Sequence, residues 1–213
     1  MTTAVSPPTP RWTKLRPYLA QQAYWASTHR FNTVSAGRRS GKTELAKRKL
    51  VMKAMSACKP WVSRFFAAAP TRDQAKRIYW DDLKALSPRN MLGRRPSEGE
   101  LMIEYITGNQ LWVIGLDVPQ RIEGQPWDWG VVDEIGNTKP SAWQENIRPA
   151  LSDRNGGCDL IGVPEGRNHY YDLDVAAKAE MKAEGDQSEW GSYTWFSSMV
   201  LPEAEIESAR RAL

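Results

Sequence analysis

Apolar and polar positions along the chain follow two periodicities, one typical of buried strands and one typical of helices. Short apolar runs bounded by Gly, Pro, Asn or Asp predict strands. Such runs cover residues 31–36, 64–69, 101–106, 111–114, 127–132, 158–163 and 193–196. Between the third and fourth runs lies Thr-Gly-Asn-Gln, which predicts that these two strands form an antiparallel hairpin.

Stretches with apolar residues at helical spacing lie between these strands. They predict helices over residues 15–28, 42–56, 71–85, 141–151, 168–183 and 202–213. The first would place Leu15, Leu19, Gln22 and Trp25 on one side, and the second counts Leu45, Leu50 and Met52 among its apolar positions. Thr71 is expected to cap the third helix, and Pro149 to break the fourth.

The order of these elements indicates an α/β fold. Strands that alternate with helices favour a mainly parallel sheet sandwiched by helices, and ligands bind such sheets at the carboxyl ends of the strands. Residues 1–14 are rich in Pro, Thr and Ser and predict a flexible N-terminal arm, whereas residues 86–99 predict a loop. Residues 15–213 are then expected to form one domain.

Composition excludes several classes of protein. Apolar runs such as Phe65–Pro70 are too short to cross a bilayer, and the first twelve residues contain no apolar signal segment, so no membrane association is expected. Cys58 and Cys158 are 100 positions apart and match no metal-ligand spacing. A reducing, cytosolic compartment is the simplest inference.

Charge is distributed unevenly. Residues 1–64 contain 13 Lys and Arg but a single acid, Glu44, whereas residues 65–213 contain 16 Lys and Arg and 24 acids. A basic N-terminal third suits a polyanion such as nucleotide phosphates or a nucleic-acid backbone. The alternative is a solvated basic face with no partner.

Residues 36–43, Ala-Gly-Arg-Arg-Ser-Gly-Lys-Thr, match the Walker A pattern G-x-x-x-x-G-K-[ST] except for Ala36 at its first position. A Gly-bearing loop lets backbone N–H groups face phosphates, and the following helix offers its positive N-terminus. Lys42 is expected to reach the β- and γ-phosphates of ATP, and Thr43 to supply a hydroxyl to Mg²⁺. The loop follows a predicted strand and opens a predicted helix, as this chemistry requires.

An acidic pair ends the strand predicted at 127–132. In P-loop NTPases an Asp after such a strand holds Mg²⁺, which assigns this role to Asp133. The adjacent Glu134 is suited to polarise the attacking water. The alternative for this pair is a solvated acidic turn. Asp128 lies at the wrong end of the strand for either role.

Several segments in order resemble the ATPase half of a tailed-phage terminase large subunit. They are residues 15–43, LRPYLAQQAYWASTHRFNTVSAGRRSGKT; residues 121–136, RIEGQPWDWGVVDEIG; and residues 143–173, which contain the run GRNHYYD. The resemblance covers about residues 15–213. It implies a P-loop NTPase fold of the ASCE, RecA-like kind with an antiparallel hairpin insertion. In that family Ala often replaces the first Gly of Walker A, so Ala36 is no departure.

The resemblance also implies roles for individual residues. Glu134 would be the catalytic carboxylate, Arg38 a sensor of the γ-phosphate, and Arg121 an arginine finger reaching a neighbouring subunit's ATP. Gln21 would contact adenine, although the adjacent Gln22 remains open. The ATP-binding set would be Gln21, Ala36, Gly37, Arg38, Arg39, Ser40, Gly41, Lys42 and Thr43, and the metal ligands Thr43 and Asp133.

A coupling motif is implied at Pro164, Gly166 and Asn168. Terminases usually have Ser or Thr before the Pro, where this chain has Val163, so a hydroxyl-based γ-phosphate sensor is not expected. His169 is interpreted as a residue at the start of a helix that packs near Tyr170 and Tyr171. Arg39 is expected to be structural or to contact DNA. Arg121 has the alternative of a surface salt bridge, and Gln21 and Gln22 that of ordinary polar residues on a helix surface.

At the level of function, the resemblance implies an ATPase motor that pumps double-stranded DNA through the portal of a procapsid. Its partners would be the small terminase subunit and other copies of itself in a ring, with a monomer possible in isolation, in the host-cell cytoplasm. Terminases usually continue into an RNase H-like nuclease with clustered acidic ligands. No such cluster follows Glu189, so that domain and its activity are not expected here.

Ten tryptophans are a high count for this length, and most are expected in the core, with base-stacking platforms as the alternative. Lys47-Arg48-Lys49 and Arg94-Arg95 are candidate DNA contacts, or else solvated faces. Two further functions remain open. One is a helicase-like ATPase, and the other is a nucleotide-binding interaction module with negligible turnover alone.

Overall fold

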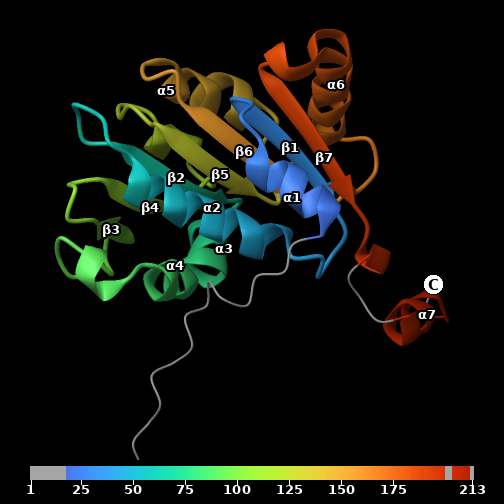
Figure 1. Cartoon of the computed structure of the whole chain (residues 1–213), viewed down its shortest axis with the longest axis horizontal. Helices are drawn as coiled ribbons and strands as arrows, with labels where there is room; N and C mark the ends of the chain where they lie inside the picture. Colours follow the sequence, from blue (N-terminus) through green and yellow to red (C-terminus); the bar gives the residue numbers. More distant parts are fainter. Residues whose placement is uncertain (1–17, 200–202, 212–213) are drawn as a thin grey trace, which may run out of the picture.

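The computed structural model describes residues 18–199 and 203–211, so the predicted N-terminal arm lies outside the described residues. The sheet is built from seven strands in the order β3-β4-β2-β5-β6-β1-β7 (Figure 1). These are β1 (Phe31–Ala36), β2 (Arg64–Ala69), β3 (Met102–Glu104), β4 (Gln110–Gly115), β5 (Trp129–Asp133), β6 (Gly157–Gly162) and β7 (Trp190–Trp195). All seven predicted strands are therefore confirmed, with ends shifted by up to three residues.

Strand pairing is parallel everywhere except at one edge. There β3 pairs antiparallel with β4, and Ile103 lies opposite Leu111. The predicted hairpin is thus present, and because β4 also pairs in parallel with β2, the hairpin extends the main sheet. The remaining parallel pairs bring the carboxyl ends of β1, β5 and β6 to one edge.

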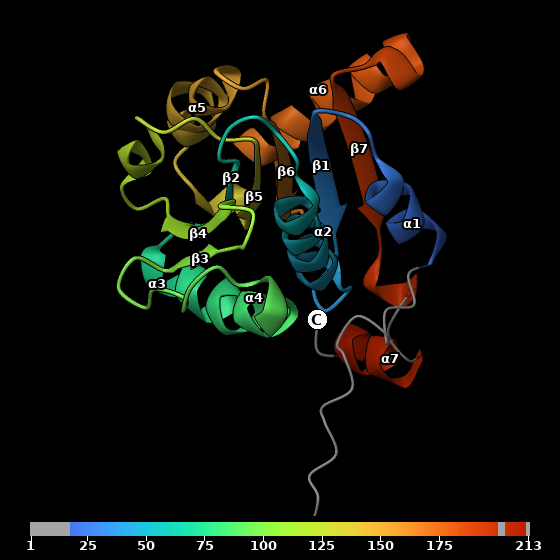
Figure 2. The same ribbon diagram turned by 60° about the vertical axis from the view of Figure 1, so that its left-hand side comes forward.

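Helices cover both faces of the sheet (Figures 1 and 2). They are α1 (Leu19–Ala26), α2 (Lys42–Ser56), α3 (Arg72–Ala75), α4 (Asp81–Leu86), α5 (Arg148–Ser152) and α6 (His169–Glu184). The last described helix, α7 (Glu203–Arg211), lies beyond the end of the sheet. Residues of α1, α2, α3 and α4 form one core cluster with the sheet, and residues of α5 and α6 form the other. This is the predicted sandwich. No described helix is long and apolar enough to cross a membrane.

Two helices contain π-helical turns that the periodicity does not predict. Lys76–Trp80 joins α3 to α4, and Ala142–Ile147 precedes α5. Pro149 lies in the first turn of α5, where its missing N–H is tolerated. The helix therefore changes from π to α hydrogen bonding near Pro149 and does not break there as predicted. Thr71 caps α3 as predicted, because its hydroxyl accepts from the amide N–H of Gln74.

The orientation predicted for the first helix is confirmed for Trp25, which packs against the core, and wrong for Leu19 and Gln22, while Leu15 lies outside the described residues. Leu19 is 82% exposed, whereas Gln21 and Tyr24 are buried. These polar side chains find hydrogen-bond partners inside the protein, which removes the penalty that normally keeps them at the surface. Apolar spacing alone could not show this. Met52 of α2 is also more exposed than predicted.

Most tryptophans contribute to the core, as predicted. Trp80, Trp127, Trp143, Trp190 and Trp195 are buried, and Trp61 is the most exposed of those in the described residues. Cys58 and Cys158 are both free thiols.

Candidate nucleotide-binding site

The phosphate-loop motif connects β1 to α2, as the sequence predicts. Arg39 and Gly41 have positive φ angles of 58° and 82°, so the chain bends sharply before the helix begins at Lys42. The Ser40 hydroxyl donates to the carbonyl of Gly37 at 2.6 Å and closes the loop. Such a curved backbone ahead of a helix N-terminus presents N–H groups to an anion.

Side chains outside the phosphate loop hold it in place through the carbonyl oxygen of Ser40. This oxygen accepts hydrogen bonds from Gln21 Nε2 at 2.9 Å and from Trp195 Nε1 at 3.2 Å. Tyr18 donates to the same oxygen at 3.4 Å. Side chains from α1 and β7 therefore fix the loop. Between the two glutamines left open by the sequence, Gln21 faces the loop and Gln22 is exposed.

Four predicted residues converge where β1 and β5 end. The Thr43 hydroxyl donates to Asp133 Oδ2 at 2.8 Å, and Lys42 Nζ lies 3.8 Å from Glu134 Oε1. Asp133 also accepts the amide N–H of Glu134 through its other oxygen at 2.9 Å. Thr43 and Asp133 are 90 positions apart in the chain, so the fold alone brings them together.

The two acids differ in their surroundings. Asp133 is 1% exposed, and burial raises its pKa although Thr43 and Lys42 act in the opposite direction. Burial also raises the pKa of Glu134, and the adjacent Asp133 adds to this shift. Glu134 has a positive φ of 49°, a conformation uncommon outside Gly and often found at functional sites. A half-buried carboxylate beside a lysine is suited to accept a proton from water.

The residues at this point fit a Mg²⁺ ion. A hydroxyl from Thr43 and a carboxylate from Asp133 are hard oxygen ligands at contact distance. In the described part of the chain, no group of three or more His, Cys, Asp or Glu could hold a metal. A Mg²⁺ ion bound here would therefore complete its shell with phosphate and water oxygens, as it commonly does.

The coupling segment predicted after β6 lies beside the phosphate loop. Arg38 forms an ion pair with Glu165 at 3.0 Å, and this pair is exposed. Gly166 has a positive φ of 69°, and the Asn168 side chain caps α6 by accepting from Tyr171 N–H. Pro164, Gly166 and Asn168 border the same small pocket as Ser35 at the end of β1.

His169 is the first residue of α6, as predicted, and one ring nitrogen lies 2.9 Å from the carbonyl oxygen of Ile135. Ile135 directly follows Glu134. The start of α6 is thereby joined to the turn that carries the acidic pair.

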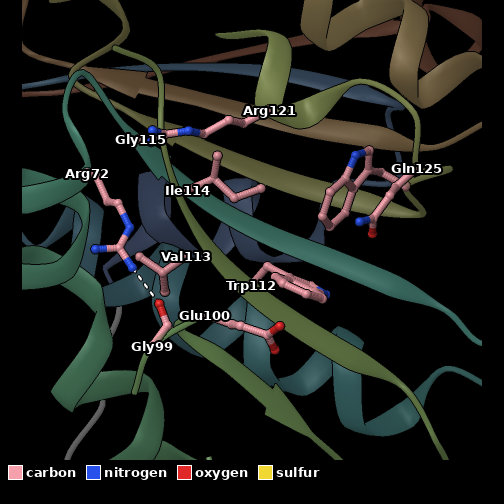
Figure 3. Close-up of a pocket in the computed structure, with 10 residues that line it drawn as sticks. Arg72, Gly99, Glu100, Trp112, Val113, Ile114, Gly115, Arg121 and Gln125 are labelled. Atoms are coloured by element: carbon pink, nitrogen blue, oxygen red, sulfur yellow. Dashed lines mark hydrogen bonds between the residues drawn. The ribbon is translucent and has the colours of Figure 1, made fainter. Parts of the chain in front are cut away.

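Arg121 lies apart from this group. It lines a pocket of about 260 Å³ with Arg72, Trp112 and Gln125 (Figure 3). Its guanidinium is 3.8 Å from Asp117. Arg121 belongs to the short helical turn Pro119–Ile122 between β4 and β5, and its pocket contains no residue of the phosphate loop. Asp128, predicted to have no role here, instead binds Arg154 at 2.8 Å at the opposite end of β5.

Comparison with known proteins agrees with this geometry. No family model matches the chain. The terminase large subunits of Thermus phage G20c and Thermus virus P23-45 are each 25% identical over 178 residues, covering 74% of this chain and 36% of the relative. The chain therefore matches about a third of the length of these curated relatives.

Among solved structures, the large terminase ATPase domain of Thermus phage P74-26 superposes with a TM-score of 0.72. It is 22% identical and covers 92% of this chain and 85% of its own. The chain has the fold of a large terminase ATPase domain. The large terminase of another thermophilic bacteriophage, solved in complex with ADP, superposes with a TM-score of 0.68 at 15% identity, covering 92% of this chain and 50% of its own.

Within this terminase fold, one predicted DNA contact is wrong. Lys47, Arg48 and Lys49 are buried, with exposures of 6%, 4% and 2%. They form ion pairs with Asp82, Glu44 and Asp159, respectively. A run of three basic residues on a helix that packs against the sheet cannot present all its charges to a polyanion. Arg94 and Arg95 are exposed and remain candidates.

Sequence reasoning also missed residues of the terminase-like site. Trp195 and Glu165 contact the phosphate loop, and Tyr79 donates to Asp133 Oδ2 at 3.1 Å. Trp195 was predicted as part of a strand and Tyr79 as part of a helix. No local motif marks either one, because their roles arise only from the packing of distant elements.

Proposed function

We propose that this chain is the ATPase motor domain of a terminase large subunit, and that residues 15–213 hydrolyse ATP to drive double-stranded DNA into a procapsid. The observation that carries the proposal is the convergence of Lys42 and Thr43 with Asp133 and Glu134. This combination of phosphate-binding and acidic residues is the one that P-loop ATPases use.

Each residue has a distinct part in hydrolysis. Lys42 and the loop N–H groups bind and orient the phosphates, while Thr43 and Asp133 would hold Mg²⁺. When bound, Mg²⁺ supplies positive charge that stabilises the transferring phosphoryl group. Glu134 orients a water molecule for attack and accepts its proton. Gln21 contacts adenine in this proposal, and its bond to Ser40 supports a position at the nucleotide.

Two arginines would complete the site. Arg38 is 79% exposed on the loop and would exchange Glu165 for the γ-phosphate. Arg121 lines a pocket that contains no residue of the phosphate loop of its own chain, which supports a role at a neighbouring subunit's ATP. The Arg38–Glu165 ion pair would break or form as ATP is bound or hydrolysed. This change would move the segment that contains Pro164, Gly166 and Asn168, and Asn168 would transmit the movement to α6.

The proposal includes a setting. The motor would assemble as a homo-oligomeric ring at the portal of a procapsid in the host-cell cytoplasm, with the small terminase subunit delivering DNA. Arg39, together with Arg94 and Arg95, would contribute to the grip on the DNA backbone.

A second candidate is a nucleotide-binding module that turns over negligibly by itself. The observation favouring it is that the pocket lined by Arg121 contains no residue of the phosphate loop of its own chain, because a single copy would then lack its finger.

Nucleotide binding tests the shared basis of both candidates. A fluorescent ATP analogue with Mg²⁺ should bind wild type, and Lys42→Ala should weaken binding by roughly tenfold or more because it removes the charge at the phosphates. The matched control is Lys59→Ala, an exposed lysine at the other end of the sheet. Equal binding by wild type and Lys42→Ala would refute the phosphate-loop assignment.

A further inference from the structure

A tyrosine reaches the metal-binding aspartate from a helix that carries no recognised motif. Tyr79 is fully buried, and its hydroxyl donates to Asp133 Oδ2 at 3.1 Å. The same oxygen accepts from Thr43 at 2.8 Å. Asp133 therefore has two side-chain donors on one oxygen and a backbone donor, Glu134 N–H, on the other.

The π-helical turn explains how Tyr79 reaches this position. Tyr79 and Trp80 are adjacent and both buried, yet they face different partners, since Trp80 Nε1 donates to Glu98 at 2.6 Å. A π turn is wider than an α turn and is often found at functional sites. Here it lies within Lys76–Trp80 and carries Tyr79 toward β5. Lys47 Nζ, 5.5 Å from the ring centre, covers the tyrosine from α2.

The direction of the bond follows from the chemistry of the two groups. An ionised carboxylate can only accept, so the Tyr79 hydroxyl is the donor to Asp133.

We infer that Tyr79 is a positioning residue of the proposed site, holding the Asp133 carboxylate in the orientation that binds Mg²⁺. The inference rests on the proposed function. A Thr43 hydroxyl that bound a metal through its oxygen would keep its proton for Asp133. Tyr79 is the second side-chain donor on the same carboxylate oxygen, and it holds the carboxylate in place from outside the set of metal ligands.

A matched control distinguishes this role from ordinary core packing. Tyr105 is also a buried tyrosine of the same core cluster, 1% exposed, and its hydroxyl lies 2.8 Å from Ser87 Oγ. Tyr79→Phe and Tyr105→Phe each delete one buried hydroxyl. Only the first faces the metal ligands.

The test is binding of a fluorescent ADP analogue to wild type, Tyr79→Phe and Tyr105→Phe, in EDTA and across a Mg²⁺ titration. In EDTA all three should bind alike. In Tyr79→Phe the Mg²⁺ concentration for half-maximal enhancement should rise by about tenfold, as expected for a lost hydrogen bond to a charged group. Tyr105→Phe should match wild type.

Each outcome has one meaning. If wild type fails to bind the analogue, the proposed function is wrong. If wild type shows Mg²⁺-dependent binding but Tyr79→Phe has the same dependence, or Tyr105→Phe shifts equally, only the inference about Tyr79 is overturned.

If Tyr79→Phe does not fold, 3-fluorotyrosine placed at position 79 keeps the hydroxyl and supplies a ¹⁹F signal. That signal should shift on adding Mg²⁺ with ADP and stay in place with ADP in EDTA. A signal that does not respond to Mg²⁺ would overturn the inference.

Discussion

Gln21 and Gln22 are neighbours in α1 with different surroundings. Gln21 is 6% exposed and bonds the carbonyl of Ser40, whereas Gln22 is exposed. We expect Gln21→Ala to weaken nucleotide affinity by roughly fivefold, because losing one hydrogen bond costs about 1 kcal/mol. Isothermal titration with an ATP analogue measures this. Gln22→Ala is the control, and an equal loss in both variants would contradict the assignment.

At this scale, sequence was reliable where a motif fixes both residue type and spacing. Lys42, Thr43, Asp133 and Glu134 converge as predicted, because the motifs state which strand end each must occupy. Sequence did not predict the roles of residues that depend on whether the side chain is buried. Helical spacing placed Gln22 on the side of Leu19 and Trp25, whereas Gln21 is the buried one. The charges of Lys47, Arg48 and Lys49 gave no sign that each has an acidic partner inside the fold.

At the scale of elements, α6 is joined to the sheet through one aspartate. Asp174 accepts from Thr33 of β1 at 2.6 Å, from Ser192 of β7 at 2.8 Å and from Lys178 at 2.6 Å. Burial acts to raise its pKa, but the hydrogen bonds from Lys178, Thr33 and Ser192 outweigh burial and leave the pKa below its ordinary value.

A depressed pKa means that Asp174 stabilises the fold above its unfolded pKa and loses this contribution as pH falls through the folded one. We expect Asp174→Asn to lower the free energy of unfolding by about 1–2 kcal/mol at pH 7. The difference from wild type should shrink as pH falls below about 4, because the unfolded chain takes up the proton first and folded Asp174 takes it up only at lower pH. Urea unfolding at pH 7 and pH 3 measures it, with exposed Asp186→Asn as control. A difference independent of pH would refute the assignment.

A buried ion pair connects α2 to β6. Lys49 Nζ lies 3.5 Å from Asp159 Oδ1, and Tyr24 and Asn32 also donate to that carboxylate at 2.7 Å. Lys49→Met should lower the free energy of unfolding by about 3 kcal/mol, because it leaves a buried carboxylate without its countercharge. Chemical denaturation checks this against exposed Lys59→Met. A loss below about 0.5 kcal/mol would show that Tyr24 and Asn32 suffice to hold the charge.

All seven strands could be predicted because short buried runs bounded by turn residues carry a strong local signal. Strand order could not, since it depends on contacts between segments such as β1 and β6 that lie over 100 residues apart. The sequence also could not predict the π turns at Lys76–Trp80 and Ala142–Ile147, because a π turn keeps the apolar composition of a helix and changes only its hydrogen bonds.

At the scale of the whole molecule, Arg121 lines a pocket that contains no residue of the phosphate loop of its own chain. If Arg121 acts on a neighbouring copy, ATPase activity per molecule should rise with protein concentration in wild type. In Arg121→Ala it should stay low and flat. Exposed Arg89→Ala serves as control. Concentration-independent activity in wild type would exclude a finger supplied by another subunit.

Turnover by Glu134→Gln tests the central claim most directly. Steady-state ATPase activity with Mg²⁺ should be measured across protein concentration for wild type and for this variant, alongside ATP binding. The account predicts that wild type turns over ATP, and that Glu134→Gln binds ATP with unchanged affinity but loses roughly 100-fold or more in turnover, since it lacks the proton acceptor. Full turnover by Glu134→Gln would contradict the account.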